Sequence, residues 1–183
     1  MAVQIVYETH SVTTDNEAGV ATGWLPGELS PQGRALAEQL GYRRRGGAVV
    51  AVFTSDLHRA LQTARIAFDG SGLPIYTDAR LRECNYGTLN GAPVTLFSDR
   101  RRERIERPFP RGESYRQVVD RTRSFLRDLS GRFDGTTVVV IAHTANRWAL
   151  DHLLCGRAMA DLVDAPFDWQ EGWFYELPTG WTG

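Results

Sequence analysis

Apolar residues occur in two recurring patterns along the chain. Uninterrupted apolar runs, typical of strands buried on both faces, occupy residues 2–7, 48–54 and 136–142. Between these runs, apolar positions recur every three or four residues, which is the spacing of one helical face. The clearest such face consists of Leu57, Ala60, Leu61, Ala64 and Phe68. Strands therefore alternate with helices, which predicts a layered α/β fold.

Residues that favour caps and turns set the expected boundaries of the helices. Ser30 followed by Pro31 predicts the start of one helix, and the glycines at 46–47 predict its end near Arg45. Ser55 with Asp56 is expected to cap the helix that follows the second strand.

A third helix is predicted after Ser114, where Val118, Thr122 and Phe125 begin a helical face, and Gly131 is expected to end it. A fourth is expected directly after His143 and carries Trp148.

Two short apolar segments complete the expected sheet. Residues 73–77 predict a short strand, and residues 173–177 predict a final edge strand. No period persists over residues 80–112, which indicates a long connection with one short helix near 96–105. The predicted fold is a three-layer α/β/α domain covering residues 1–183, with a mostly parallel central sheet and helices on both faces.

Composition narrows the classes of partner and compartment. The net charge is −1 and all 21 cationic side chains are arginine, so we expect no nucleic-acid or membrane partner and no lysine chemistry. No apolar run approaches the ~20 residues of a membrane span, and no basic stretch precedes the first strand. The two cysteines, Cys84 and Cys155, fit a reducing compartment and are too few for a zinc site. A cytoplasmic protein without a metal ion is therefore expected.

Several common catalytic motifs are absent. A glycine-rich dinucleotide motif does not follow the first strand, and the patterns GxxxxGK[ST], HExxH and CxxC do not occur. The nearest approach to a serine-hydrolase elbow, at residues 112–116, lacks its closing glycine. The sequence therefore disfavours dinucleotide or nucleotide binding by these motifs, metal-dependent catalysis and catalysis by a serine nucleophile.

The four histidines fall into two groups. His58 and His152 lie inside predicted helices, where packed or surface histidines are common. His10 and His143 each end a strand, and the carboxyl ends of parallel strands form the usual ligand site of such sheets. Either could be a strand-end histidine bonded to a backbone carbonyl. Together with Arg59 they supply what phosphoryl transfer needs, an attacking imidazole and cationic groups around the oxygens.

The order of motifs resembles the histidine phosphatase superfamily, which includes cofactor-dependent phosphoglycerate mutases. The segment SDLHRALQTA at residues 55–64 is similar to the family's SDLxRAxQTA and is the most specific match. Further matches are THSVTTDN at 9–16 to RHGETxxN, GW at 23–24, LSPQG at 29–33 to LTxxG, LRECNYGTLNG at 81–91 to LxExxxGxxxG, GES at 112–114 and VVVIAH at 138–143. The resemblance implies a phosphoglycerate mutase-like fold.

The resemblance also implies residue roles. His10 would be the nucleophile that becomes a phosphohistidine, and Arg59 with His143 would hold the phosphoryl oxygens. Glu83 would be the general acid and then the base, unless it is a surface carboxylate paired with Arg80 or Arg82. The implied phosphate- and substrate-binding residues are Thr9, Ser11, Asn16, Thr22, Gly23 and Thr144.

Three positions depart from the family pattern. Thr9 replaces the arginine before the nucleophile, and Ser11 and Thr144 replace the glycines after the two histidines. A threonine hydroxyl cannot replace a bidentate guanidinium. Arg111, Arg147 or an arginine within 100–107 could supply the missing charge, although that arginine run also fits a solvated face.

The expected function is hydrolysis of a small phosphomonoester by a metal-independent histidine phosphatase that needs no cofactor. The connection between Glu83 and Gly112 leaves less room for a closing lid than mutases of the resembled family usually have, which favours hydrolysis over a mutase reaction. The alternatives are a mutase of the same family and a catalytically weak relative that binds a phosphorylated ligand or a protein partner. Oligomeric state stays open, with a homodimer as one alternative. Aromatic residues that could line the pocket are Trp24, Tyr86, Phe109, Trp169 and Trp173.

Overall fold

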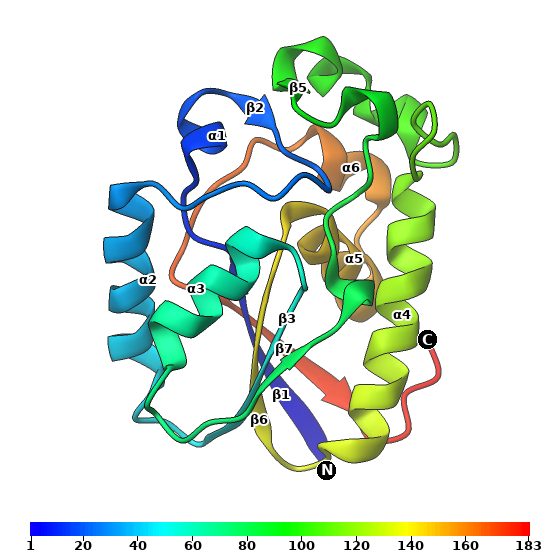
Figure 1. The fold of residues 1–183 in the computed structure, drawn as a ribbon. Helices are drawn as coiled ribbons and strands as arrows, with labels where there is room; N and C mark the ends of the chain where they lie inside the picture. The colour runs from blue at the N-terminus through cyan, green and yellow to red at the C-terminus, as the bar shows by residue number, and fades with distance from the viewer.

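The computed structural model describes residues 1–183 as a central sheet covered by helices on both faces (Figure 1). The sheet strands are β1 (Ala2–Thr9), β3 (Val49–Thr54), β4 (Ile75–Thr77), β6 (Thr137–Ala142) and β7 (Trp173–Pro178). The helices are α1 (Thr14–Glu17), α2 (Pro31–Arg44), α3 (His58–Phe68), α4 (Tyr115–Arg132), α5 (Thr144–Cys155) and α6 (Met159–Asp164). A small separate ribbon pairs β2 (Val20–Ala21) with β5 (Ala92–Pro93).

The strand order is β4-β3-β6-β1-β7. The first four strands run parallel, and β7 pairs antiparallel with β1 at the edge of the sheet. The predicted mostly parallel sheet and its final edge strand are confirmed.

Alternation along the buried strands divides the core into two layers. Val6, Val52 and Val139 face α2 and α3, where they pack against side chains such as Leu40 and Phe68. The intervening residues, such as Ile5, Phe53 and Val140, face α4 and α5 and pack against Phe125, Leu126 and Leu150. Helices therefore cover both faces, as the pattern of apolar runs predicts.

Two boundary predictions are wrong. Leu57, rather than Ser55 or Asp56, precedes the first turn of α3, and no side chain caps that turn. Both polar residues are engaged elsewhere, because the Ser55 hydroxyl bonds His143 and the Asp56 carboxylate pairs with Arg82. Helix α4 also continues through Gly131 to Arg132, so that glycine does not end it.

The segment between β4 and α4 has no long regular element, as expected. It contains four short 3₁₀ turns, at Ala79–Leu81, Gly87–Leu89, Val94–Leu96 and Ser98–Arg104. The last of these lies where the short helix near 96–105 is predicted. Phe97 and Phe109 anchor the segment in a second core cluster with Tyr115 and Trp148. The sequence pattern did not indicate α6 or the β2–β5 ribbon.

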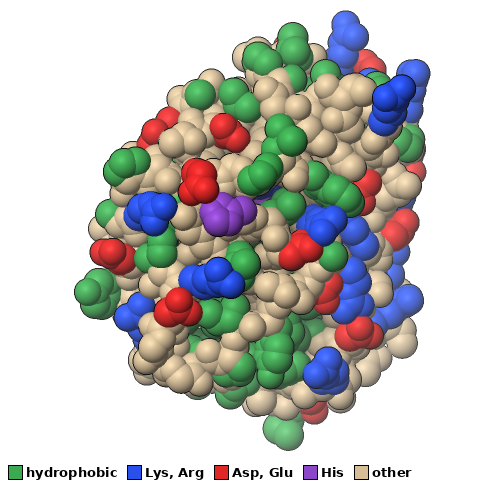
Figure 2. Space-filling model, viewed as in Figure 1, with side chains coloured by type: hydrophobic (Ala, Val, Ile, Leu, Met, Phe, Trp, Pro, Cys, Tyr) green, Lys and Arg blue, Asp and Glu red, His purple; other side chains and the backbone are tan.

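Charged side chains of both signs are mixed on the face shown in Figure 2, where arginines gather over α4 together with acidic residues. No helix combines the length and apolarity needed to cross a membrane.

Candidate active site

The carboxyl ends of β1 and β6 lie side by side and bring two histidines together. Thr9 pairs with Ala142 in the parallel register, and the His10 N–H donates to the Ala142 carbonyl at 2.9 Å. The next residue after each strand is a histidine, and the two imidazole centroids are 5.0 Å apart. The predicted meeting of His10 and His143 is therefore observed.

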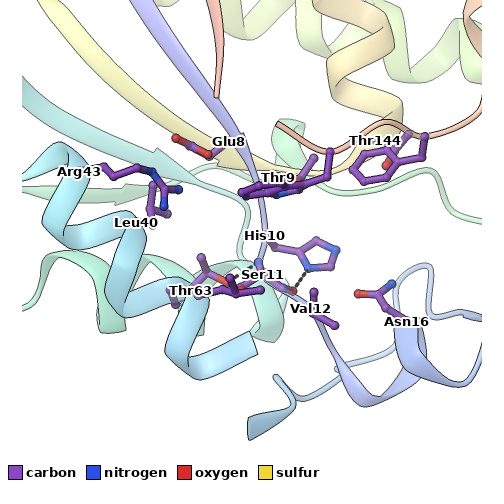
Figure 3. A pocket seen from close by; sticks show the side chains of 14 residues that line it. Glu8, Thr9, His10, Ser11, Val12, Asn16, Leu40, Arg43, Thr63 and Thr144 are labelled. Atoms are coloured by element: carbon purple, nitrogen blue, oxygen red, sulfur yellow. Dashed lines mark hydrogen bonds between the residues drawn. The ribbon is translucent and has the colours of Figure 1, made fainter. Parts of the chain in front are cut away.

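Two adjoining cavities open on either side of His10. The first, which we call the Glu83 cavity, has a volume of about 170 Å³ and is lined by His10, Arg59 and Glu83 among other residues. The second, which we call the Thr9 cavity, has a volume of about 290 Å³ and is lined by Thr9, Ser11, Arg43 and Trp169 among others (Figure 3). A pocket smaller than the roughly 300–1,000 Å³ of a drug-sized ligand site suits a small substrate.

Hydrogen bonds fix the tautomer of His10. Arg59 Nε can only donate, and it points at His10 Nε2 from 3.3 Å, so Nε2 carries the lone pair. His10 Nδ1 then carries the proton and donates to the Ser11 carbonyl at 2.8 Å. Burial, reinforced by the Arg59 charge, lowers the pKa of His10 to about 3. At neutral pH the imidazole is therefore uncharged, with Nε2 in the form that can attack phosphorus.

His143 contacts Arg59, is fully buried and lines neither cavity. Arg59 Nη2 donates to His143 Nδ1 at 3.3 Å, and His143 Nε2 donates to the Ser55 hydroxyl at 2.7 Å. Burial and the Arg59 charge hold the pKa of His143 well below its ordinary value. A phosphate dianion beside this ring would favour its charged form, so ligand binding and protonation of His143 are coupled.

Arg59 is the group that both histidines contact. It is only 2% exposed, and its terminal nitrogens also donate to the carbonyls of Gly23 at 2.8 Å and Leu25 at 3.1 Å. Gly23 has a φ of +55°, and a Cβ there would lie 1.8 Å from the Asn90 side chain. Glycine at position 23 thus allows the loop to bring its carbonyl to Arg59.

Glu83 lies in the same cavity as His10 and is only 8% exposed. Its Oε1 accepts the Cys84 N–H at 2.7 Å. Burial raises the pKa of this carboxyl, while the Cys84 N–H and the Arg59 charge oppose the rise. Neither neighbouring arginine pairs with it, because Arg80 is bonded to Asp78 and Asp128, and Arg82 to Asp56. A carboxyl with a raised pKa beside a nucleophile is suited to acid–base work.

The other predicted binding residues divide between the cavities. Thr22 and Gly23 line the Glu83 cavity, whereas Thr9 and Ser11 line the Thr9 cavity. Asn16 and Thr144 line both. Of the aromatic candidates, Tyr86 lines the Glu83 cavity and Trp169 the Thr9 cavity, and Trp24, Phe109 and Trp173 line neither.

Arg101 is the pocket residue that sequence reasoning identified only as part of an arginine run. It lines the Glu83 cavity, its guanidinium lies 5.8 Å from the centroid of the Trp148 ring, and it forms no ion pair. Arg147, by contrast, pairs with Asp151 at 3.1 Å, and Arg111 lines neither cavity. The spacing of the run gave no signal for which arginine turns inward, since its segment has no regular period.

The arrangement supports chemistry on a small phosphate ester. One imidazole presents an unprotonated nitrogen, one guanidinium contacts both imidazoles, and a buried carboxyl faces the same cavity. No group of three or more His, Cys, Asp or Glu side chains is arranged to hold a metal ion.

Comparison with known proteins gives the family. The model of the histidine phosphatase superfamily, branch 1, matches residues 9–168. The chain belongs to this superfamily. Its relatives include phosphoserine phosphatase 1 of Hydrogenobacter thermophilus, 26% identical over 84% of this chain and 77% of that protein. Another, from Yersinia enterocolitica, bears the name "Probable phosphoglycerate mutase GpmB" and is 29% identical over 77% of this chain and 69% of its own length.

Solved structures agree with this membership. YhfR of Bacillus stearothermophilus superposes with a TM-score of 0.82 at 26% identity, over 98% of this chain and 97% of its own. The mycobacterial glucosyl-3-phosphoglycerate phosphatase superposes with a TM-score of 0.76 at 26% identity, over 89% and 84% of the two chains. The phosphoglycerate mutase-like fold is confirmed, and the family supports a phosphatase or mutase enzyme.

Proposed function

We propose that this protein is a metal-independent phosphatase that hydrolyses a small phosphomonoester through a phosphohistidine on His10. The observation that carries the proposal is the fixed tautomer of His10, whose unprotonated Nε2 accepts from Arg59 at the cavity that His10, Arg59 and Glu83 line. Relatives named as phosphatases support the same chemistry.

In the first step, His10 Nε2 attacks phosphorus and forms the N–P bond. The bond from phosphorus to the leaving oxygen breaks, and the Glu83 carboxyl gives its proton to that oxygen, so that an alcohol departs. Arg59 turns its Nε–H from the imidazole to a phosphoryl oxygen. The raised pKa of Glu83 favours the protonated form that this step uses.

In the second step, the Glu83 carboxylate takes a proton from water, and the water oxygen attacks phosphorus. The N–P bond breaks, its electron pair returns to His10 Nε2, and inorganic phosphate leaves. His143, held by Ser55 and Arg59, stabilises the phosphoryl oxygens when the bound dianion favours its protonated form.

Arg101 supplies the guanidinium that Thr9 does not. The Thr9 side chain lines only the cavity on the other side of His10, whereas Arg101 lines the cavity that holds Glu83. An arginine without a carboxylate partner inside a pocket is available to an anionic oxygen of the substrate. We therefore assign to Arg101 a contact with the phosphoryl group or with a second anionic group of the substrate.

A mutase reaction is the second candidate, because some relatives are named as phosphoglycerate mutases. In that reaction the phosphoryl group on His10 returns to an acceptor hydroxyl instead of to water. Incubation with a phosphoester and a non-phosphorylated alcohol in excess distinguishes the two: a hydrolase releases inorganic phosphate, and a mutase yields a new ester.

Substitution of the nucleophile tests the proposal. His10→Ala should abolish phosphate release across a panel of phosphomonoesters, with a loss on the order of 10⁴-fold or more, as for other catalytic nucleophiles. The exposed His58 provides the matched control, and His58→Ala should retain activity. Unchanged turnover by a folded His10→Ala protein would refute the assignment, and ligand-induced stabilisation without turnover by the unmodified protein would instead indicate a binding module.

A further inference from the structure

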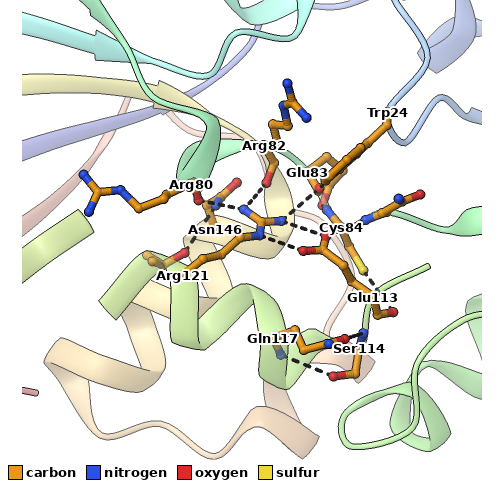
Figure 4. Close-up of polar contacts among 12 residues, drawn as sticks. Trp24, Arg80, Arg82, Glu83, Cys84, Glu113, Ser114, Gln117, Arg121 and Asn146 are labelled. Atoms are coloured by element: carbon orange, nitrogen blue, oxygen red, sulfur yellow. Dashed lines mark hydrogen bonds and ion pairs between the residues drawn. The ribbon is translucent and has the colours of Figure 1, made fainter. Parts of the chain in front are cut away.

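Helix α4 presents one arginine, Arg121, whose bonds go to the segment that carries Glu83 and to the Glu113 carboxylate (Figure 4). Arg121 Nη1 donates to the carbonyls of Arg80 at 2.7 Å and Arg82 at 2.6 Å, and Nη2 donates to the Glu83 carbonyl at 3.0 Å. Nε and Nη2 also donate to the two carboxylate oxygens of Glu113, at 3.0 and 3.1 Å. A guanidinium has five N–H groups, so every one of them is used.

Glu113 extends the contact to the other side of the catalytic carboxyl. Its Oε2 accepts the Asn85 N–H at 2.9 Å, and its own N–H donates to the Asn85 carbonyl at 2.8 Å. Residues on both sides of Glu83 are therefore tied to one ion pair. The pair is mostly buried, with 16% of the Arg121 side chain and 19% of the Glu113 side chain exposed.

This anchoring does for Glu83 what the strand ends do for His10 and His143. No sheet ladder includes residues 80–86, and the turn at Ala79–Leu81 is a single 3₁₀ turn. Apart from Arg121, the Glu83 carbonyl is bonded only by the Trp24 indole N–H, at 2.7 Å. The position of the Glu83 carboxyl in the cavity thus depends on side-chain bonds to its backbone.

We propose that Arg121, locked by Glu113, is a positioning residue that places the Glu83 carboxyl for proton transfer. The inference rests on the proposed function, since it assigns Arg121 to the acid–base half of that reaction. Arg121 touches no reacting atom. It acts by fixing the backbone on which the acid is carried, and a displacement of about 1 Å in such a group can cost on the order of 100-fold in rate.

The charge of Arg121 has a second effect, which must be separated from the geometric one. The charged groups that face the Glu83 carboxyl are Arg59 and Arg121, and both lower its pKa against the dominant effect of burial. Lysine at position 121 keeps the charge but offers three donors from one nitrogen, which cannot span three carbonyls and a carboxylate. Arg121→Lys therefore separates the fork geometry from the charge.

The test compares leaving groups. Formation of phosphohistidine from 4-nitrophenyl phosphate needs no acid, because nitrophenolate leaves unprotonated, whereas an alkyl ester such as phosphoserine needs one. In Arg121→Gln and Arg121→Lys, kcat/KM for phosphoserine should fall about 10–100-fold, while kcat/KM for 4-nitrophenyl phosphate changes less than about threefold. With 4-nitrophenyl phosphate, kcat and KM should fall together, because the phosphoenzyme accumulates when Glu83 is misplaced for the water step.

Arg116→Gln is the matched control, since Arg116 lies on the same helix and pairs with Glu106 at 2.8 Å outside the cavity. It should leave both substrates unaffected. Glu113→Gln is the second variant and weakens the ion pair with Arg121. It should lower kcat/KM for phosphoserine by a smaller factor, again with little change for 4-nitrophenyl phosphate. If Arg121→Gln does not fold, the same comparison of substrates is made with Glu113→Gln.

Equal losses of kcat/KM on both substrates would overturn the proposal, because they indicate a purely structural role. Full activity of Arg121→Lys would also overturn it, because charge alone would then suffice. Glu83→Gln, measured in the same assays, separates the two levels of inference. If it shows no preference for the better leaving group, the acid assignment itself is wrong, and Arg121 has no catalytic carboxyl to position.

Discussion

Two parts of the candidate active site are built in different ways. His10 and His143 follow adjacent parallel strands, and the hydrogen bond from His10 N–H to the Ala142 carbonyl ties the two strand ends together. Glu83 instead lies in an irregular segment, anchored by Arg121 and Trp24 through its backbone. The proposed nucleophile, His10, is positioned by the sheet, and the proposed acid, Glu83, is positioned by side chains.

This difference has a physical consequence for robustness. A strand end inside a five-stranded sheet is held by many backbone bonds and a packed core, so one substitution moves it little. The segment that carries Glu83 has few such bonds and depends more strongly on the Arg121–Glu113 ion pair, because removing one partner leaves a buried group uncompensated. A single substitution near Glu83 should therefore displace its carboxyl and lower activity more than a single substitution near the strand ends displaces His10.

Among substitutions in the segment anchored by side chains, Glu83→Gln should give the largest loss of activity. The amide keeps the shape but cannot donate the acid proton, so kcat/KM for an alkyl phosphate should fall about 10²–10⁴-fold. Steady-state assays with phosphoserine and 4-nitrophenyl phosphate measure the difference. Comparable loss on the two esters would mean that the carboxyl does not act as the acid.

Arg101→Gln should have the next largest effect, a rise in KM. A lost charge-assisted hydrogen bond costs roughly 1.5–3 kcal/mol, which corresponds to about a 10–100-fold rise in KM. Arg100→Gln, at the exposed neighbouring position, is the control and should bind substrate normally. An unchanged KM in Arg101→Gln would show that this arginine only covers Trp148.

Thr9→Arg should increase activity, by about tenfold on generic phosphomonoesters, because it adds a second guanidinium beside His10, which lines both cavities, to the one assigned to Arg101. The Thr9 cavity, of about 290 Å³, has room for the longer side chain. The measurement is kcat/KM on a phosphoester panel. If activity falls on one ester while it rises on the rest, position 9 sets substrate preference; if no ester improves, the missing guanidinium does not limit the rate.

The last effect concerns stability rather than activity. Folding lowers the pKa of His10 from 6.5 to about 3, so the unfolded chain binds a proton that the folded chain does not over that interval. Stability should therefore decrease as the pH falls from 6.5 towards 3. His10→Asn should reduce this dependence in urea unfolding at several pH values without abolishing it, because burial also lowers the pKa of His143, and His58→Asn is the control. An unaltered slope would mean that His10 is not held uncharged by the fold.

The same contrast explains what the sequence could predict. The apolar runs predicted β1, β3 and β6, and strand ends in parallel sheets converge, so His10 and His143 could be placed together before any coordinates. Glu83 came from motif resemblance alone, because its segment has no period. Nothing in the spacing indicated that Arg121, more than one turn after the start of α4, would donate to three backbone carbonyls. Side-chain anchoring of irregular backbone follows from tertiary packing and leaves no periodic signal.

The N-cap of α3 illustrates the converse case. Ser55 and Asp56 are residue types that favour caps, but the Ser55 hydroxyl bonds His143 and the Asp56 carboxylate pairs with Arg82. Local propensity is overridden there because His143 needs its orienting hydroxyl.

Trapping the phosphoenzyme tests the central claim most directly. Glu83→Gln incubated with 4-nitrophenyl phosphate should accumulate a phosphoryl group, because the first step needs no acid and the second lacks its base. The account predicts one label per chain, lost in acid, stable in base and located on His10. A label that survives acid, a label on any other residue, or turnover by the unmodified protein without any label would contradict it.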